Sequence, residues 1–153
     1  MTSALRWFEL SGNPDAIRNR YSDPPDLSPF LLREIFLYGH DATLTLTGEL
    51  SRPPDSSIDD QSAVASLTLI FWSVVDLSQD GVLVDRKLDV EISQSDNGNI
   101  AISANGLGNT LSATCKSFDI YGFRVYSDDH VQQNRKTLFT YRNVWNSCLI
   151  SLL

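Results

Sequence analysis

The stretch GHDATLTLTGEL, residues 39–50, contains the change of periodicity that decides the fold. From Ala42 onward apolar residues alternate with polar ones, so that Leu44 and Leu46 share one face and threonines share the other. A repeat of two residues is the pattern of a strand with one buried face. The stretch therefore predicts a half-buried strand that begins just after the turn at Gly39.

Upstream of this strand the spacing of apolar residues is helical. In SGNPDAIRNRY, Asn13 is the predicted N-cap and Pro14 the first helical residue. In LSPFLLREIFLY, apolar side chains recur at intervals of three and four, and Gly39 would follow that helix with a positive φ. We therefore predict two short helices within residues 1–39.

Downstream, alternating segments separated by turns continue almost to the C-terminus. The segment VASLTLIFWSVVDL is the most apolar, and VLVDRKLDVEIS turns Asp89 and Glu91 outward. The pair Asn97-Gly98 suits a tight hairpin turn, and Gly122 shifts the phase of its strand as a β-bulge would. The stretch KTLFTYRNVWNSCLISLL could form a strand or a helix, and we favour a last strand near residues 137–141.

Six or seven strands in consecutive hairpins, with few helices between them, argue against parallel winding. We predict a single domain over residues 1–153. Its sheet spans residues 40–145, and the pattern leaves residues 146–153 unassigned. The expected fold is an antiparallel β-sandwich or a strongly bent meander sheet, with the two short helices packed at one end.

Charge is distributed unevenly along the chain. The net charge is −7, and 15 of the 19 acidic residues are aspartate. Residues 131–153 hold three basic residues and no acid, whereas residues 1–130 carry a balance of −10. An acidic body repels nucleic acid and attracts basic partners. The segment after Met1 has no apolar core, and LIFWSVV is too short to span a membrane, so we expect a soluble cytoplasmic protein.

Residue patterns typical of catalysis or metal binding are missing from the sequence. His40 and His130 lie 90 residues apart in no metal-ligand spacing, and no GxSxG motif occurs. Cys115 shares an alternating face with Leu111, which predicts a buried thiol, and Cys148 stands alone. We expect no catalytic residue, no cofactor and no metal.

The pair His40-Asp41 allows two interpretations. It could be a base with its orienting carboxylate, or it could be a polar turn in which the two side chains satisfy nearby backbone groups. The turn is favoured, so Gly39, His40 and Asp41 are predicted to form a structural junction. The catalytic interpretation keeps open a small ligand-binding β-sandwich or a hydrolase-like enzyme.

Taken in order, several of these elements resemble the immunity protein 50 family of bacterial polymorphic-toxin systems. They are a helix that ends before the HDA step at residues 40–42, an alternating strand that ends in Arg52-Pro53, and the later segments LTLIF and VVDLSQDG. The resemblance covers about residues 28–127. It implies a non-catalytic cytoplasmic protein that binds and neutralises a cognate toxin domain.

The acidic charge fits a basic partner such as a nuclease toxin, with no nucleic acid or membrane involved. We expect a monomer or a weak homodimer that pairs through residues 137–145. The interface is predicted to combine aspartate-rich loops with an exposed tryptophan. Its candidate residues are Asp55, Asp59, Asp60, Trp72, Asp76 and Asp80.

Overall fold

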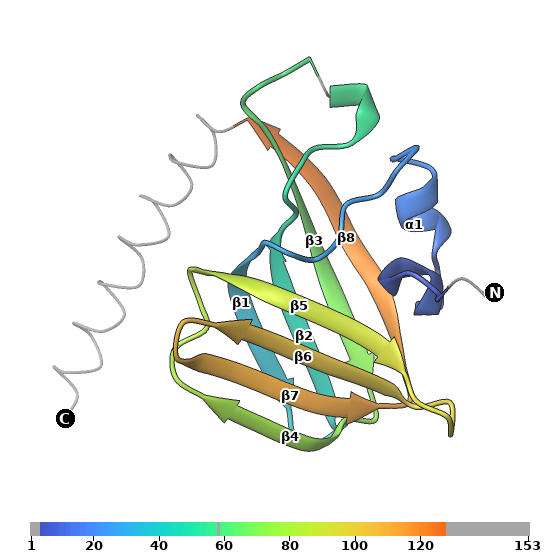
Figure 1. Ribbon diagram of the computed structural model, residues 1–153, viewed down its shortest axis with the longest axis vertical. Coiled ribbons are helices and arrows are strands. Elements are labelled where there is room, and N and C mark those ends of the chain that lie inside the picture. The colour runs from blue at the N-terminus through green and yellow to red at the C-terminus, as the bar shows by residue number, and fades with distance from the viewer. Residues whose placement is uncertain (1–3, 58, 128–153) are drawn as a thin grey trace, which may run out of the picture.

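A computed structural model describes residues 4–57 and 59–127, which form one antiparallel sheet of eight strands (Figure 1). The strands are β1 (Phe30–Tyr38), β2 (Thr43–Glu49), β3 (Ala63–Trp72), β4 (Val75–Asp80), β5 (Arg86–Gln94), β6 (Ile100–Gly106), β7 (Asn109–Cys115) and β8 (Ser117–Ser127). The helical segments are η1 (Trp7–Leu10), α1 (Asp15–Arg18) and η2 (Asp55–Ser57), of which η1 and η2 are 3-10 helices.

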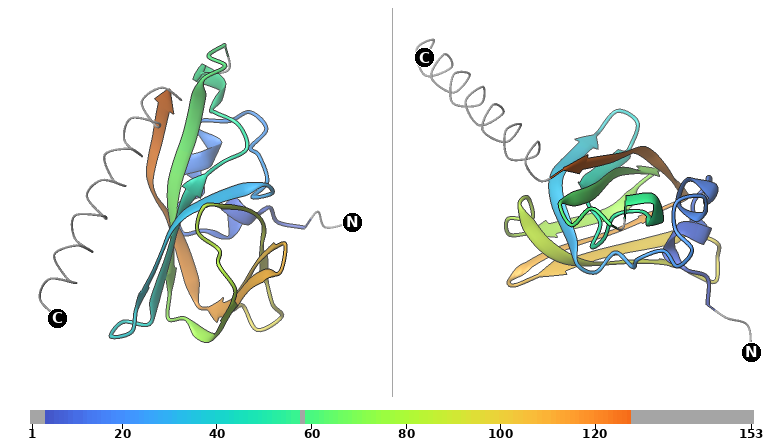
Figure 2. Two further views of the ribbon diagram at one scale, coloured as in Figure 1. Left: turned by 90° about the vertical axis from the view of Figure 1, so that its left-hand side faces the viewer. Right: turned by 90° about the horizontal axis from the view of Figure 1, so that it is seen from above.

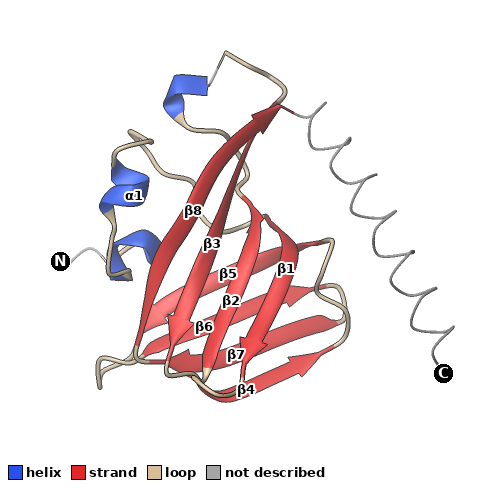
Figure 3. Cartoon of the chain, turned by 180° about the vertical axis from the view of Figure 1, so that it is seen from behind, coloured by secondary structure: helices blue, strands red, loops and turns tan. Residues whose placement is uncertain are grey.

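The strand order β4-β7-β6-β5-β1-β2-β3-β8 divides the sheet into two halves that share β1 as their joint. Only Phe30–Leu32 of β1 pair with β5, whereas the strand pairs with β2 along nearly all its length. The sheet bends at this joint. The first half-sheet (β1, β2, β3, β8) therefore crosses over the second half-sheet (β4–β7), as Figure 3 shows from behind. The predicted antiparallel, strongly bent sheet is confirmed.

The core lies between the two half-sheets because alternate residues of every strand point inward. On the first half-sheet Phe71 and Phe118 are fully buried, and their ring centroids are 5.4 Å apart. The second half-sheet contributes Ile102 and Cys115, so the predicted burial of that thiol is confirmed. Burial in this apolar setting raises the pKa of Cys115 to about 11. Each large buried side chain contributes roughly 1.5–3 kcal/mol to stability.

The second predicted helix is wrong, because most of its residues form β1. A β-bulge between Leu32 and Glu34 adds one residue to the strand, so that Leu32 and Ile35 both face inward opposite β2. A spacing of three residues on one strand face imitates helical spacing. Pairing with β2 and β5 then outweighs local helix propensity. The sheet therefore begins at Phe30 and not after residue 39.

The other predicted helix is present as α1, but Asn13 does not cap it, and Pro14 occupies the N-cap position. The Asn13 side chain instead donates to the Ile120 carbonyl at 2.7 Å and accepts from the Ile120 amide at 2.8 Å. The Gly12 amide donates to the Phe118 carbonyl at 2.9 Å. These bonds cover the outer edge of β8, an edge strand that would otherwise be open there.

The N-terminal segment closes one open side of the bent sheet. Helix η1 contacts both β5 and β8, and buries Trp7 and Phe8 between them. Figure 2 shows this arrangement from above, with the two half-sheets as two layers and the N-terminal helical segments at one side. The predicted packing of helical segments at one end is thus confirmed for α1, and η1, which was not predicted, lies at the same end.

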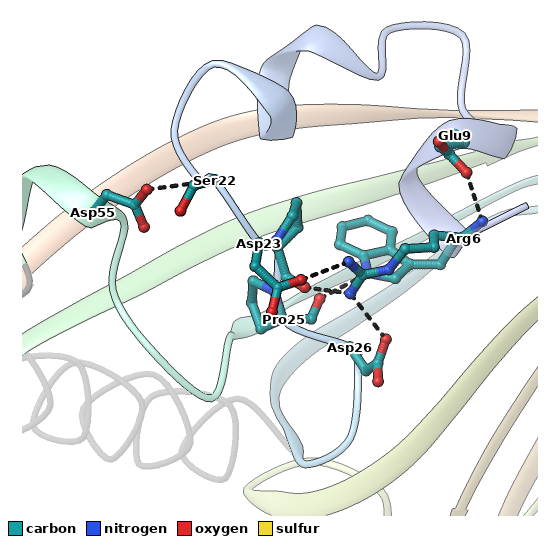
Figure 4. A network of polar contacts seen from close by, with 9 residues as sticks. Arg6, Glu9, Ser22, Asp23, Pro25, Asp26 and Asp55 are labelled. Carbon is teal, nitrogen blue, oxygen red and sulfur yellow. Dashed lines mark hydrogen bonds and ion pairs between the residues drawn. The ribbon is translucent and has the colours of Figure 1, made fainter.

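The loop after α1 is held against η1 by Arg6 (Figure 4). The Arg6 guanidinium contacts the Asp23 carboxylate at 3.0 Å and the Asp26 carboxylate at 3.3 Å, and it also donates to the Pro24 carbonyl. The Trp7 indole N–H donates to the Pro25 carbonyl at 3.0 Å. The loop therefore enters β1 from a defined position.

The hairpin predicted at Asn97-Gly98 and the bulge predicted at Gly122 are both confirmed. Asn97 and Gly98 lie in the turn between β5 and β6, and Gly98 has a φ of 86°. Gly122, with a φ of 61°, lies where the pairing of β8 with β3 changes register. The last strand predicted at residues 137–141, the homodimer edge at 137–145 and Cys148 fall outside the described residues.

Candidate functional site: an acidic trough on the second half-sheet

The outer face of the second half-sheet is built from residues that pair directly across β5, β6, β7 and β4. Three successive rows follow from the strand register. They are Ser93–Ala101–Thr114–Val75, Glu91–Ser103–Ser112–Ser78 and Asp89–Asn105–Thr110–Asp80. In each row the two central positions, on β6 and β7, carry short side chains or an amide. The acidic residues of the second and third rows lie on β5 and β4, the outer strands of this half-sheet.

Residues of the first two rows line a depression of about 450 Å³, here named the acidic trough, and the third row lies beside it. Its lining consists of Asp76, Glu91, Ser93, Ala101, Ile102, Ser103, Ser112, Ala113 and Thr114. The floor is low because β6 and β7 present only short side chains outward. Strands β5 and β4 are three strand spacings apart, about 14 Å, which leaves room for one helix or one extended segment.

Four carboxylates lie at the margins of the trough. Asp89 and Glu91 project from β5, whereas Asp76 and Asp80 belong to β4. Among the described residues, none of the four forms an ion pair or a side-chain hydrogen bond. Lys87 extends the same face of β5 beyond Asp89. Four carboxylates that pair with no cation among the described residues, two of them lining the depression, produce a local field that attracts cationic groups.

Asp76 reaches the trough because β4 is irregular at this point. The register with β7 shifts between Val75 and Ser78, and Asp76 adopts a positive φ of 54°. Aspartate tolerates this backbone conformation better than most residues. The extra residue bends the strand, and Asp76 lines the depression beside Thr114. Alternation in the sequence cannot predict this placement.

The aspartates predicted at the interface are divided between two ends of the molecule. Asp76 and Asp80 lie at the trough, whereas Asp55, Asp59 and Asp60 belong to the loop before β3. Two of the loop carboxylates make local contacts. Asp55 accepts from the Ser22 amide at 2.7 Å, as Figure 4 shows. Asp60 accepts from the Ser62 hydroxyl at 2.7 Å and from the Ser62 amide at 3.0 Å. These hydrogen bonds lower the pKa of both carboxyl groups.

Trp72 lies at the end of β3 and Ala63 at its start, so Trp72 is roughly 30 Å from the aspartate loop. Its indole N–H donates to the Asp119 carboxylate at 3.0 Å on the outer face of the first half-sheet. A three-residue connection separates Trp72 from Asp76. Trp72 therefore neighbours the trough but faces away from its floor.

The His40-Asp41 pair occupies the turn between β1 and β2, so it joins two strands and not a helix to a strand. Both residues are exposed, and within the described part of the chain neither side chain makes a hydrogen bond or an ion pair. The hydrogen bonds predicted from these side chains to neighbouring backbone groups are therefore absent among the described residues. The positive φ predicted for Gly39 occurs instead at Ala42, where φ is 50°. The trough lining includes neither His40 nor Asp41.

Asp89 and Glu91 were missed as site residues, although the sequence already turned them outward on their strand. What the sequence lacks is the register that places them across from Asp76 and Asp80. That register depends on two hairpins and on β4 returning to pair with β7.

Comparisons with protein-family models, with curated proteins and with solved structures return no match for the chain. Over residues 4–57 and 59–127, no helix has the length and apolar character needed to cross a membrane. Across the same residues no three His, Cys, Asp or Glu side chains gather in a way that could hold a metal ion.

Proposed function

We propose that this protein is a non-catalytic bacterial immunity protein that binds and neutralises a cognate toxin domain. The resemblance to the immunity protein 50 family motivates the class of function. The observation that carries the proposal is the acidic trough, in which Asp76 and Glu91 line a floor of short side chains and Asp80 and Asp89 end the adjacent row. A surface of this shape and charge suits a protein segment more than a small molecule.

The partner surface that fits the trough is basic and protrudes. A helix about 10–12 Å wide enters a space bounded by strands about 14 Å apart, and its Lys or Arg side chains then reach both margins. Toxins that cleave nucleic acid carry such basic groups around their active sites, because they bind phosphates. Covering those groups with carboxylates would keep the toxin from its substrate.

Co-expression with a candidate toxin domain encoded beside this gene tests the function. We expect the wild-type protein to restore growth to cells that produce the toxin, and to co-purify with it. In the test variant Asp76, Asp80 and Asp89 are replaced by Asn and Glu91 by Gln. Because exposed ion pairs contribute roughly 0.2–1 kcal/mol each, we expect this variant to lose about tenfold or more in affinity.

A matched control removes the same charges elsewhere. Glu34→Gln combined with Asp15→Asn, Asp41→Asn and Asp96→Asn changes the same residue types at exposed positions away from the trough. Of these four residues only Asp15 forms an ion pair with a described residue, an exposed one with Arg18 at 3.6 Å. We expect this control to protect cells as the wild type does. Equal affinity of the two variants would place the interface outside the trough. Failure of the wild type to bind or to protect would contradict the immunity function itself.

A further inference from the structure

The outer face of the first half-sheet differs in character from the acidic trough. The register across β1, β2, β3 and β8 places its residues in rows. The rows are Glu34–Thr47–Thr68–Tyr121 and Phe36–Thr45–Ile70–Asp119, followed by the pairs Tyr38–Thr43 and Trp72–Ser117. We name this surface the aromatic face. Aromatic side chains project at its margins, while threonines and Ile70 form the floor.

Much apolar surface is exposed here. The exposed fractions are 49% for Phe36, 51% for Tyr38, 41% for Trp72 and 68% for Tyr121. An apolar surface of several large side chains on a small protein typically marks a place that another segment or molecule covers.

Several of these side chains are held in position without a partner. The rings of Phe36 and Tyr38 stack with centroids 5.2 Å apart, and the Trp72 indole is fixed by Asp119. On the floor, the hydroxyls of Thr47 and Thr68 are joined at 2.8 Å. A prearranged surface loses little side-chain entropy when it is covered.

The chain itself supplies a segment that suits this face. After Ser127, at the end of β8, 26 residues follow, from Asp128 to Leu153. Apolar residues in them recur at intervals of three or four, the spacing that lines one side of a helix. They are Leu138, Tyr141, Trp145, Leu149 and Leu152.

Charge also favours the packing of this segment on the aromatic face. Residues 131–153 hold three basic residues and no acid, and the aromatic face includes the carboxylates of Glu34 and Asp119. Arg124, near the end of β8, is a basic residue on the same face. Because the segment is tethered at the last residue of β8, its local concentration at the face exceeds that of a second copy.

We propose that residues 131–153 pack across the aromatic face and cover Phe36, Tyr38, Trp72 and Tyr121. This docking is independent of the acidic trough, which lies on the outer face of the other half-sheet. The docked segment supplies the apolar cover that the first half-sheet lacks, and it leaves the trough open to a partner.

Cross-linking in the full-length chain tests the proposal. The variant Thr45→Cys places a thiol near the centre of the aromatic face, and the native Cys148 lies in the segment. Cys115 is buried and its pKa is raised to about 11, so it reacts slowly with a maleimide. The matched control Ser103→Cys places a thiol at the centre of the other outer face. A short bis-maleimide is added to dilute protein, and linked peptides are identified by mass spectrometry.

We expect a link between residues 45 and 148 within one chain, and no link between residues 103 and 148. Links formed only between two chains would show that a second copy covers the face, and would overturn the proposal. Absence of the 45–148 link, or an equal yield from Ser103→Cys, would overturn it as well.

A second pair of variants tests the apolar side of the segment. Leu149→Asp is introduced into the Thr45→Cys chain, and Asn146→Asp adds the same charge at a polar residue nearby. We expect Leu149→Asp to abolish the link and to increase binding of a hydrophobic dye, while Asn146→Asp changes neither. If both variants retain the link, apolar docking of the segment is wrong.

Discussion

Tyr21 shows how one buried side chain links the loops at the end of the sheet. Its hydroxyl donates to the Arg52 carbonyl at 3.0 Å, and its ring packs edge-on against Phe123 with centroids 6.2 Å apart. Burial raises the pKa of Tyr21 from 10.0 to about 12, although the nearby Arg52 guanidinium acts in the opposite direction. The folded state therefore prefers the neutral phenol.

This preference predicts a pH dependence of stability. Because the folded pKa of Tyr21 lies above its unfolded value, its contribution is complete below about pH 10 and is lost as the pH rises toward 12. We expect the free energy of unfolding to fall by up to about 2–3 kcal/mol more in the wild type than in Tyr21→Phe over this range. Urea denaturation at several pH values measures the free energy of unfolding. If this free energy depends on pH in the same way in both proteins, the prediction is wrong.

At the scale of elements, the β1–β2 hairpin depends on a glycine at a crowded position. A Cβ built on Gly48 would lie 2.5 Å from the Phe30 ring and 2.6 Å from the Leu31 carbonyl oxygen. Phe30 is fully buried at the joint between the two half-sheets. The close approach of β1 to β2 at this joint therefore requires a residue without a side chain.

Gly48→Ala is accordingly expected to destabilise the protein by about 1–3 kcal/mol, because Phe30 or the backbone of β1 must move. Gly39→Ala is the matched control, since an added Cβ there meets nothing within 4 Å. We expect the control to remain within about 0.5 kcal/mol of the wild type in urea denaturation. Equal losses from both substitutions would show that Gly48 is not crowded in solution.

At the scale of the whole molecule, the bend of the sheet creates two outer faces of different chemistry. The second half-sheet carries the acidic trough, and the first carries the aromatic face with Phe36, Tyr38, Trp72 and Tyr121. The net charge of −7 strengthens the field around the trough at long range. Separate faces allow a charged partner and an apolar segment to be held at once.

If the trough binds a basic toxin, salt should slow their association. We expect the association rate constant to fall about tenfold between 50 and 500 mM salt, because screening shortens the reach of the charges. The dissociation rate should change less. Stopped-flow measurements with the wild type and with the neutralised trough variant test this prediction. The association rate constant of the variant should depend much less on the salt concentration. A rate that is insensitive to salt in the wild type would contradict steering by the trough.

Much of the fold follows from local sequence patterns. Alternation predicted β2 and β3, and Asn97-Gly98 predicted the β5–β6 hairpin, because side-chain direction and turn conformation depend on neighbouring residues. Alternation likewise turned Asp89 and Glu91 outward. These features need no information from distant parts of the chain, so the sequence determined them by itself.

Only the tertiary structure decided the identity of β1 and the composition of the site. The bulge after Leu32 imitates helical spacing, and pairing with β2 and β5 is what makes the segment a strand. The bulge at Asp76 and the pairing of β4 with β7 bring Asp76 across from Glu91. Both depend on hydrogen bonds between segments far apart in sequence. The energy of such contacts appears only when the sheet closes, so no local pattern encodes them.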